Sequence, residues 1–323
     1  MIKVSQARYF EIQSKFLQIP YSQSKDWYEY LSLGREEILF FVDNEIDPMI
    51  MFFGKKIKVP FSTKNILIID TPLIKSNFTE KTIRKRLLSL LEHDFIGFEI
   101  DSISEYDVEY EVGFRRAGFI RPLALSKSPL SIDLNLATSF NYDSNWKRNV
   151  KKSKEAGVIV EEILNPTKED AILFVRLFED TKKQKKLKYS LDSEAIYRLI
   201  RSDNIRMFYA KKDDIVLSAQ IFYHYNLHCY SIYRVNSIAS RSNNSSYVLY
   251  DEIFKKLSSE GFLAYDFGRI PPSNHATDSV YTFKNASRGR KVQYNGEWVF
   301  YKNKWIEYLM FLYKQFVLKK QRY

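Results

Sequence analysis

Apolar positions along the first 140 residues recur mainly at strand spacing and change to helical spacing in two segments. Two apolar runs, 38–42 and 49–53, flank the polar residues 43–48, which predicts a β-hairpin. From Thr79 to about His93, apolar residues recur at the spacing of a half-buried helix. The other expected elements are strands at 65–70, 95–100 and 130–134 and a helix-like segment at 105–119.

A similar order of elements recurs in the second half of the chain. The expected elements there are strands at 207–210, 215–223, 227–235 and 261–267, with a helix at 245–259 before the last strand. Corresponding residues, such as Pro48 and Ile215 or Leu39 and Met207, are separated by a nearly constant 167 or 168 positions. An ordered set of elements at one offset predicts two copies of one α/β unit. We therefore expect an α/β (α+β) fold with mixed sheets flanked by helices, divided into domains at 1–140 and 141–304.

The composition is typical of a two-domain intracellular protein. The chain has 323 residues, of which 45% are hydrophobic, and this is enough apolar surface for two cores. Its single cysteine, Cys229, excludes an internal disulfide framework and fits a reducing compartment. The first residues lack the apolar core of a signal peptide, so we expect a cytoplasmic protein. A net charge of +11 favours polyanionic partners: tRNA, pyrophosphate-linked lipids or an anionic membrane face.

The C-terminal residues 305–323 begin with apolar and charged positions at helical spacing. We favour a helix that packs on the first domain. The alternative is a helix in a membrane interface, peripheral on the inner face of the cell membrane, with Lys319, Lys320 and Arg322 on lipid headgroups.

A basic helix is expected between the two copies. Asp143 or Ser144 can cap its start, and Gly157 can end it. Trp146 lies on one face with Val150 and Ser153, and basic residues surround that face: Lys147, Arg148, Lys151, Lys152 and Lys154. Such a helix is either an ordinary solvated surface or a face for a phosphate-rich ligand. A second capped helix is expected from Thr167, ending in the basic run 182–188.

Residues 265–291 gather positive charge directly after the last strand. The cations are Arg269, Lys284, Arg288, Arg290 and Lys291. Because Lys284 follows the strand-like run 281–283, we expect its stem to be packed, and a packed lysine suits stabilisation of an anion. Asp266 is either a structural cap or a proton acceptor, and His275 is a candidate base in the same loop.

Several short segments together resemble the FemABX family of non-ribosomal peptidyltransferases, which are built from two GNAT-like (acyl-CoA N-acyltransferase-type) domains. The segments are Gln23-Ser24 with Trp27, Ala117-Gly118-Phe119, residues 130–134, residues 146–152 with Gly157-Val158, residues 178–181, residues 265–268, and Phe283-Lys284. The resemblance covers nearly the whole chain, although each motif is short.

The resemblance implies transfer of an amino acid from aminoacyl-tRNA to an amino group of a lipid-linked or nucleotide-linked cell-envelope precursor, without metal or cofactor. It places the lysine that stabilises the oxyanion at Lys284, beside Phe283. The sequence departs from the family pattern at Gln184, where an arginine is usual, and no lysine closely follows Trp27, although Arg35 is near. The acceptor is therefore open between a peptidoglycan precursor and a surface-polysaccharide intermediate.

An acyl-CoA donor is the main alternative, with an amino sugar or similar acceptor. In acetyltransferases of this fold, a glycine-rich loop at a helix start holds the pyrophosphate of CoA. Arg241 stands in register with that loop, but Asn244 and Ser246 replace its small residues. A second alternative is a basic module that binds RNA or lipid without catalysis.

The expected site follows from these arguments. We expect catalytic roles for Lys284, Phe283 and Asp266, and a donor phosphate loop at Arg241, Asn244 and Ser246. The expected substrate-binding residues are Trp146, Arg148, Asn149, Lys152, Thr181, Tyr223, Tyr233, Arg269 and Asn285. We expect no metal site, because His224 and His228 share a strand face without a third ligand at suitable spacing.

Overall fold

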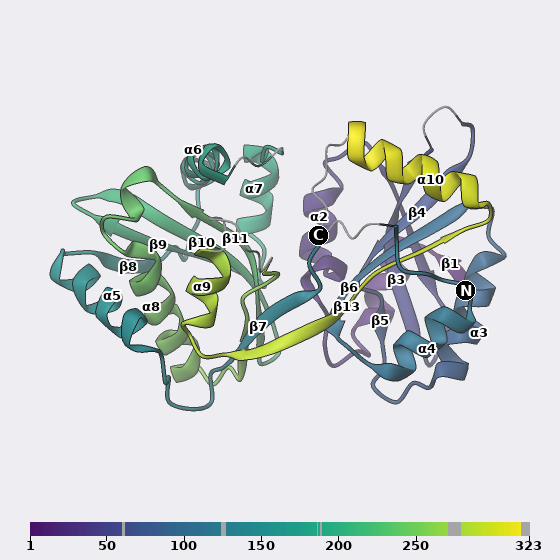
Figure 1. Ribbon diagram of the computed structural model, residues 1–323, viewed down its shortest axis with the longest axis horizontal. Coiled ribbons are helices and arrows are strands. Elements are labelled where there is room, and N and C mark those ends of the chain that lie inside the picture. The colour runs from purple at the N-terminus through teal and green to yellow at the C-terminus, as the bar shows by residue number, and fades with distance from the viewer. Residues whose placement is uncertain (60–61, 124–126, 186, 188, 271–278, 318–323) are drawn as a thin grey trace. The chain divides into compact units, whose positions relative to one another are not determined.

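The computed structural model describes residues 1–59, 62–123, 127–185, 187, 189–270 and 279–317. The chain forms two compact units (Figure 1). The first comprises residues 1–28, 34–130 and 292–323, and the second comprises residues 29–33 and 131–291. The units therefore divide near residues 130 and 291, whereas the sequence suggested 140 and 304. The second difference arises because β13 (Arg290–Tyr301) pairs with β6 (Gly97–Glu105) of the first unit.

The first unit is a twisted sheet covered by helices. Its strands lie in the order β1-β2-β3-β4-β6-β13 and are antiparallel except for the parallel pair β4 and β6, while the short β5 pairs with β3. The elements not yet bounded are β1 (Ile2–Val4), β2 (Glu37–Val42), β3 (Ile50–Lys58), β4 (Asn65–Asp70), β5 (Leu73–Ile74), α1 (Gln6–Gln13), the 3₁₀ turn η1 (Tyr21–Gln23), α3 (Glu80–Leu91) and α4 (Val108–Arg116). α2 (Lys25–Leu31) begins in this unit.

Local sequence signals explain the two helices α3 and α4. The Thr79 side chain accepts a hydrogen bond from the Thr82 amide, and Asp107 accepts one from the Tyr110 amide, so both helices begin at capped positions. Ile83 of α3 is fully buried against α4, where a Cβ added to Gly113 would lie 2.8 Å from the Ile83 side chain. The glycine therefore permits the close crossing of the two helices.

The second unit repeats this architecture. Its strands lie in the order β7-β12-β11-β10-β9-β8, antiparallel except for the parallel pair β11 and β12. Its strands are β7 (Leu130–Asn135), β8 (Ile159–Glu162), β9 (Ile205–Lys212), β10 (Ile215–Tyr225), β11 (His228–Asn236) and β12 (Ala264–Asp266). Its helices are α5 (Ser144–Glu155), α6 (Lys168–Lys185), α7 (Ser193–Ile200), the 3₁₀ turn η2 (Ile238–Ser240), α8 (Ser245–Ser259) and α9 (Ser279–Asn285).

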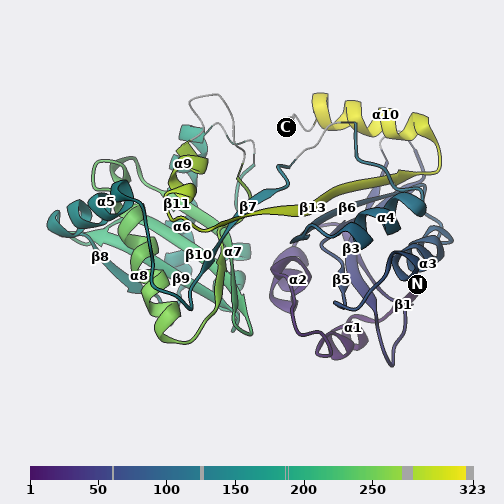
Figure 2. The ribbon, with the colours of Figure 1, turned by 60° about the horizontal axis from the view of Figure 1, so that its bottom comes forward.

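The predicted duplication is confirmed by the topology. In each unit, two antiparallel strand pairs are followed by a crossover helix and a parallel strand: β2-β3-β4-α3-β6 and β9-β10-β11-α8-β12. Figure 2 shows α8 lying along the face of β9 and β10. The two copies differ at their parallel pair. β4 and β6 pair from Ile66 to Asp70, whereas β11 and β12 pair only from His228 to Tyr230.

One predicted element has the wrong type. Residues 281–283 were expected to be strand-like, but they belong to the helix α9. Phe283 and Ala286 are both buried and lie one helical turn apart. The three residues 281–283 alone are too few to distinguish helical spacing from the alternation of a strand. The strand expected at 261–267 is also shorter, because only Ala264–Asp266 pairs with its neighbours.

The last helix, α10 (Lys304–Leu312), packs on the first unit and continues as the π-helical turn η4 (Tyr313–Val317). Met310 is buried against Val59 and Ile66. Lys314 forms an ion pair of 2.5 Å with the buried carboxylate of Glu99. The favoured packing role is therefore the one that residues 304–317 adopt. Within the described ranges, no helix is long and apolar enough to cross a membrane.

Candidate active site in the second unit

Lys284 is held at the end of β12 by three backbone carbonyl groups. Its side chain is only 7% exposed, and Nζ donates to the carbonyl oxygens of Phe267 at 2.6 Å, Gly268 at 2.9 Å and Arg269 at 3.0 Å. An ammonium has three donors, so this arrangement satisfies all of them. The expected packing of Lys284 is present, although a helix and not a strand provides it.

The turn that supplies these carbonyls is itself fixed by Asp266. Its Oδ1 accepts from the Gly268 amide at 2.7 Å and from Ser131 Oγ at 2.6 Å. Gly268 has a φ of +71°, a conformation that glycine adopts without strain. The Asp266 carboxylate thus holds the turn, in agreement with the structural one of its two expected roles. This turn presents its carbonyl groups to Lys284.

The electrostatic surroundings of Lys284 act in two directions. Burial, and then the positive charge of Arg234, lower its pKa to about 7, while the Asp266 carboxylate raises it. The three carbonyl acceptors stabilise the charged form. The ammonium is therefore desolvated and confined, and it lies near the border of protonation at neutral pH.

Phe283 anchors α9 in an aromatic cluster. Its ring centroid lies 5.0 Å from that of Trp146 and 4.9 Å from that of Tyr247, and the Arg234 guanidinium lies 4.8 Å above the ring. Trp146 comes from α5, whose start is capped by Asp143 Oδ1 accepting from the Trp146 amide at 2.7 Å. Trp146 is fully buried. It therefore supports Phe283 from within the core, with no surface in contact with solvent.

A cationic pocket adjoins this cluster. It has a volume of ≈ 200 Å³ and is lined by the C-terminal end of α6, the end of β11, the start of α8 and one face of α9. Three of its residues are cations: Lys185, Arg234 and Arg241. The remaining lining residues are Thr181, Gln184, Asn236, Ser240, Asn244, Ser246, Tyr247, Ser279, Val280 and Phe283.

The start of α8 adds to the positive potential of the pocket. Asn244 has φ 51° and ψ 26°, in the left-handed region, and precedes the first residue of the 15-residue helix. A helix N-terminus presents unpaired amide groups and a partial positive charge to an anion. The pocket walls desolvate the Lys185 ammonium and, followed by Arg234 and Arg241, lower its pKa, although the residue as a whole is accessible to solvent. Lowering of an ammonium pKa by neighbouring cations marks a local excess of positive charge.

Hydroxyl groups beneath the pocket fix its loop. Ser218, Ser240 and Ser245 form a buried cluster, with Ser218 Oγ 2.8 Å and 2.5 Å from the other two. Ser246 Oγ donates to Asn236 Oδ1 at 2.9 Å. Thr181 Oγ1 accepts from the Asn236 amide at 2.9 Å and so ties α6 to β11. These hydroxyl groups are hydrogen-bonded within the pocket wall and fix its shape.

The structure brings together some of the expected site residues. Arg241, Asn244, Ser246, Thr181 and Phe283 line the pocket. Lys185 and Arg234 also line it, but the sequence analysis did not single them out. An arginine between Tyr233 and Val235 in the strand-like run 227–235 was the available signal for Arg234, and the basic run at 182–188 contained Lys185.

Other expected residues lie outside the lining of this pocket. The exposed Arg148 donates to Asn145 on α5, and Asn149 and the exposed Lys152 lie on the same helix. Tyr223 is buried in the sheet, and the Tyr233 hydroxyl lies 3.1 Å from that of Tyr30. Asn285 is the last residue of α9, and Arg269 contributes its carbonyl to Lys284. His275 lies outside the described residues.

No group of metal-ligating side chains occurs among the residues that the structure describes. His224 and His228 lie at the end of the β10–β11 hairpin, and burial lowers the pKa of both. Burial also raises the pKa of the Cys229 thiol to about 12, so the thiol stays protonated.

A larger cavity of ≈ 710 Å³ lies elsewhere in the second unit, between the β8–α6 connection and the end of α7. Its main charged group is already paired, because Arg206 donates to Glu162 at 2.5 Å and 2.9 Å and also binds Glu260. Volume alone therefore does not mark the site, and the smaller cationic pocket has the chemistry.

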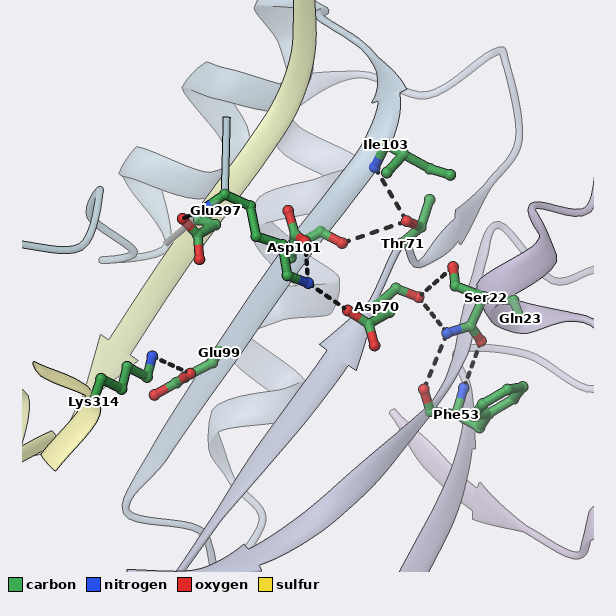
Figure 3. A network of polar contacts seen from close by, with 11 residues as sticks. Ser22, Gln23, Phe53, Asp70, Thr71, Glu99, Asp101, Ile103, Glu297 and Lys314 are labelled. Carbon is green, nitrogen blue, oxygen red and sulfur yellow. Dashed lines mark hydrogen bonds and ion pairs between the residues drawn. The ribbon is translucent and has the colours of Figure 1, made fainter. Parts of the chain in front are cut away.

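The corresponding strand ends of the first unit are closed by polar contacts (Figure 3). The Thr71 amide donates to the Asp101 carbonyl at 2.8 Å, and Lys127 Nζ lies 2.7 Å from Asp101 and 3.5 Å from Asp70. The fully buried Gln23 donates to the Asp70 carbonyl at 2.5 Å and accepts from the Phe53 amide at 2.8 Å. These groups satisfy one another, so this end of the first unit is structural.

Comparisons with known proteins agree with this architecture. Residues 141–285 match the family model described as an acetyltransferase (GNAT) domain. FemX shares 13% identity with the chain at a TM-score of 0.76, over 96% of this chain and 100% of FemX. L-PGS from Bacillus licheniformis shares 12% identity at a TM-score of 0.60, over 94% and 99%. No curated protein is significantly similar to the chain in sequence.

A tandem GNAT protein from the clavulanic acid biosynthesis pathway shares 11% identity at a TM-score of 0.50, over 92% of this chain and 93% of its own. The chain therefore has the tandem GNAT fold, and its second unit carries the GNAT domain match. The expected resemblance to the FemABX fold is confirmed.

Proposed function

We propose that this protein transfers an amino acid from aminoacyl-tRNA to an amino group of a cell-envelope precursor and forms an amide. The observation that carries the proposal is a desolvated lysine ammonium next to a cationic pocket in the second unit. FemX and L-PGS, which share the fold, support the choice of an aminoacyl donor. The acceptor would be a lipid-linked peptidoglycan or surface-polysaccharide intermediate, reached at the inner face of the cell membrane.

The pocket suits the phosphate groups of the donor. Arg234 and Arg241 offer planar guanidinium groups, Lys185 at the end of α6 adds a third cation, and the start of α8 lines the same pocket. Guanidinium groups and helix N-termini are favourable partners of phosphate oxygens. A pocket of ≈ 200 Å³ has room for a phosphate-bearing end and not for a folded RNA stem. The basic face of α5, with the exposed Arg148 and Lys152, is available for further phosphates.

The reaction needs little beyond position and charge. The neutral acceptor amine attacks the ester carbonyl carbon, and its lone pair forms the new C–N bond. The carbonyl π electrons move to oxygen, and Lys284 would stabilise that oxyanion by exchanging one carbonyl bond for it. The oxyanion then re-forms the carbonyl, the C–O bond to the ribose breaks, and the proton lost by the amine is taken up by the leaving oxygen.

An acyl-CoA donor is the second candidate, and Asn244 favours it. The loop adopts the left-handed conformation at this position although glycine is absent, so it retains a shape that can receive a pyrophosphate. The family model that matches residues 141–285 describes an acetyltransferase domain, which also favours this donor.

Discharge of labelled donors by the purified protein tests the proposal. The protein is incubated with a mixture of aminoacyl-tRNAs, or with acetyl-CoA, together with a membrane extract that supplies acceptors. We expect label to move from tRNA to an alkali-stable amide. Consumption of acetyl-CoA with no loss of aminoacyl-tRNA would replace the first donor with the second.

A further inference from the structure

The last helix carries a second apolar face that the fold leaves uncovered. Its inner stripe, Ile306, Met310 and Tyr313, packs on Val59 and Ile66 of the first unit. A second stripe at helical spacing points outward, and its large side chains are exposed: Trp305 by 77%, Tyr308 by 49%, Leu309 by 37% and Phe316 by 71%. We call these four residues the aromatic stripe.

Positive charge borders the aromatic stripe. Lys302 and Lys304 are exposed at the start of α10 (upper right in Figure 1). Lys58 and Lys64 are exposed on the β3–β4 hairpin, whose residues Val59 and Ile66 contact the inner face of the helix. In the sequence, Lys319, Lys320 and Arg322 follow directly. The one acid on the helix, Glu307, is half-buried.

The chemistry of this surface selects its partner. Tryptophan and tyrosine are favoured where an apolar phase meets water, and lysines beside them pair with anionic headgroups. A protein partner could bind the aromatic stripe without the neighbouring lysines. An anionic bilayer matches both, because its apolar interior receives the aromatic side chains and its headgroups pair with the lysines. Since no described helix can span a membrane, contact through these residues would be peripheral.

We propose that the aromatic stripe docks the first unit on an anionic lipid surface, with α10 in the plane of the headgroups. The inference builds on the proposed lipid-linked acceptor but stands on a different surface from the candidate active site. Docking would hold the enzyme on the surface that carries its acceptor and raise the local concentration of that acceptor.

Vesicle sedimentation tests this proposal without any substrate. The full chain is mixed with vesicles of phosphatidylcholine alone or with phosphatidylglycerol added, and Trp305→Glu is compared with Leu17→Glu. Leu17 is 84% exposed in the same unit, so the control makes the same charge change at an equally exposed apolar residue. We expect binding to the anionic vesicles, weakened at least about tenfold by Trp305→Glu and little changed by Leu17→Glu.

Tryptophan fluorescence gives a second readout. Trp146 and Trp298 are fully buried and Trp27 is half-buried, so a blue shift on adding vesicles should come from Trp305 and disappear in Trp305→Phe. Equal binding by Trp305→Glu and Leu17→Glu would overturn the proposal. Self-association of the wild type that Trp305→Glu abolishes would overturn it too, by making a second copy the partner. Because neither readout uses a donor or acceptor, failure here leaves the proposed reaction untouched.

Discussion

Replacing Lys284 with methionine is the sharpest test of the candidate active site. The substitution keeps the length of the stem and removes the ammonium that holds the carbonyl oxygens of Phe267, Gly268 and Arg269. If that ammonium stabilises the oxyanion, its loss should lower kcat by about 10²- to 10³-fold, or roughly 3–4 kcal/mol, while KM for the donor changes little.

The effect on folding should be smaller, because two costs oppose each other. Lowering the pKa of Lys284 from 10.5 to about 7 corresponds to about 5 kcal/mol of unfavourable burial at neutral pH, a cost that methionine does not have. Against this, about 1–3 kcal/mol is lost for each carbonyl left without a donor, less where water enters. The two are of similar size, so we expect Lys284→Met to fold with a Tm near that of the wild type.

The assay is transfer of labelled amino acid under single-turnover conditions, with near-UV circular dichroism to check folding. Lys183→Met, at an exposed position on α6, controls for the loss of one positive charge. A folded Lys284→Met variant whose kcat stays within about threefold of the wild type would refute the role, since even one lost oxyanion donor costs more. Equal losses of donor affinity in Lys284→Met and Lys183→Met would show that Lys284 contributes only its positive charge to donor binding.

Three further outcomes are expected. Arg241→Ala should raise KM for the donor about tenfold or more and weaken the salt dependence of that KM, with kcat nearly unchanged. Lys183→Ala should change neither KM nor its salt dependence. Steady-state kinetics at two salt concentrations will show whether the pocket binds phosphate. Because the folded pKa of Lys284 lies below its unfolded value, the unfolded chain binds the extra proton between about pH 7 and 10.5, so stability should rise with pH across that window. The rise should be steeper in the wild type than in Lys284→Met, where the lowered pKa of Lys185 still contributes. Urea unfolding at pH 7 and 9.5 measures this, and equal slopes would contradict it. Asp143→Ala should cost about 1 kcal/mol of unfolding free energy, because it removes the cap of α5, while Ser144→Ala should be neutral; a reversal in chemical denaturation would assign the cap to Ser144.

Most of the fold was predictable from periodicity and caps. The duplication was readable because each copy repeats strands whose apolar residues face one core, and the capped helices at Thr79 and Asp143 began where expected. The short helix α9 was not predictable, because its few apolar residues fit either period and tertiary packing of Phe283 decides between them.

The candidate site was predictable in part. Lys284 and the loop at Arg241 could be found because they adjoin strand and helix ends in the sequence. Arg234 and Lys185 could not be placed, since only the folding of β11 beside the end of α6 brings them into one pocket. Trp146 shows the opposite error: an aromatic residue on a basic helix suggested a ligand contact, but burial made it part of the core.

The unequal parallel pairs of the two units carry a consequence for how substitutions will be tolerated. The strands β4 and β6 pair as far as Asp70 and Asp101, and Lys127 forms ion pairs with both carboxylates. Substitutions there should therefore lower stability and leave specific activity unchanged. The pair β11–β12 parts after Tyr230, and changes around Arg234 should spare stability and alter turnover. A saturation mutagenesis screen scored for abundance and for activity should therefore find mainly loss of abundance at the parallel pair of the first unit and mainly loss of activity at that of the second.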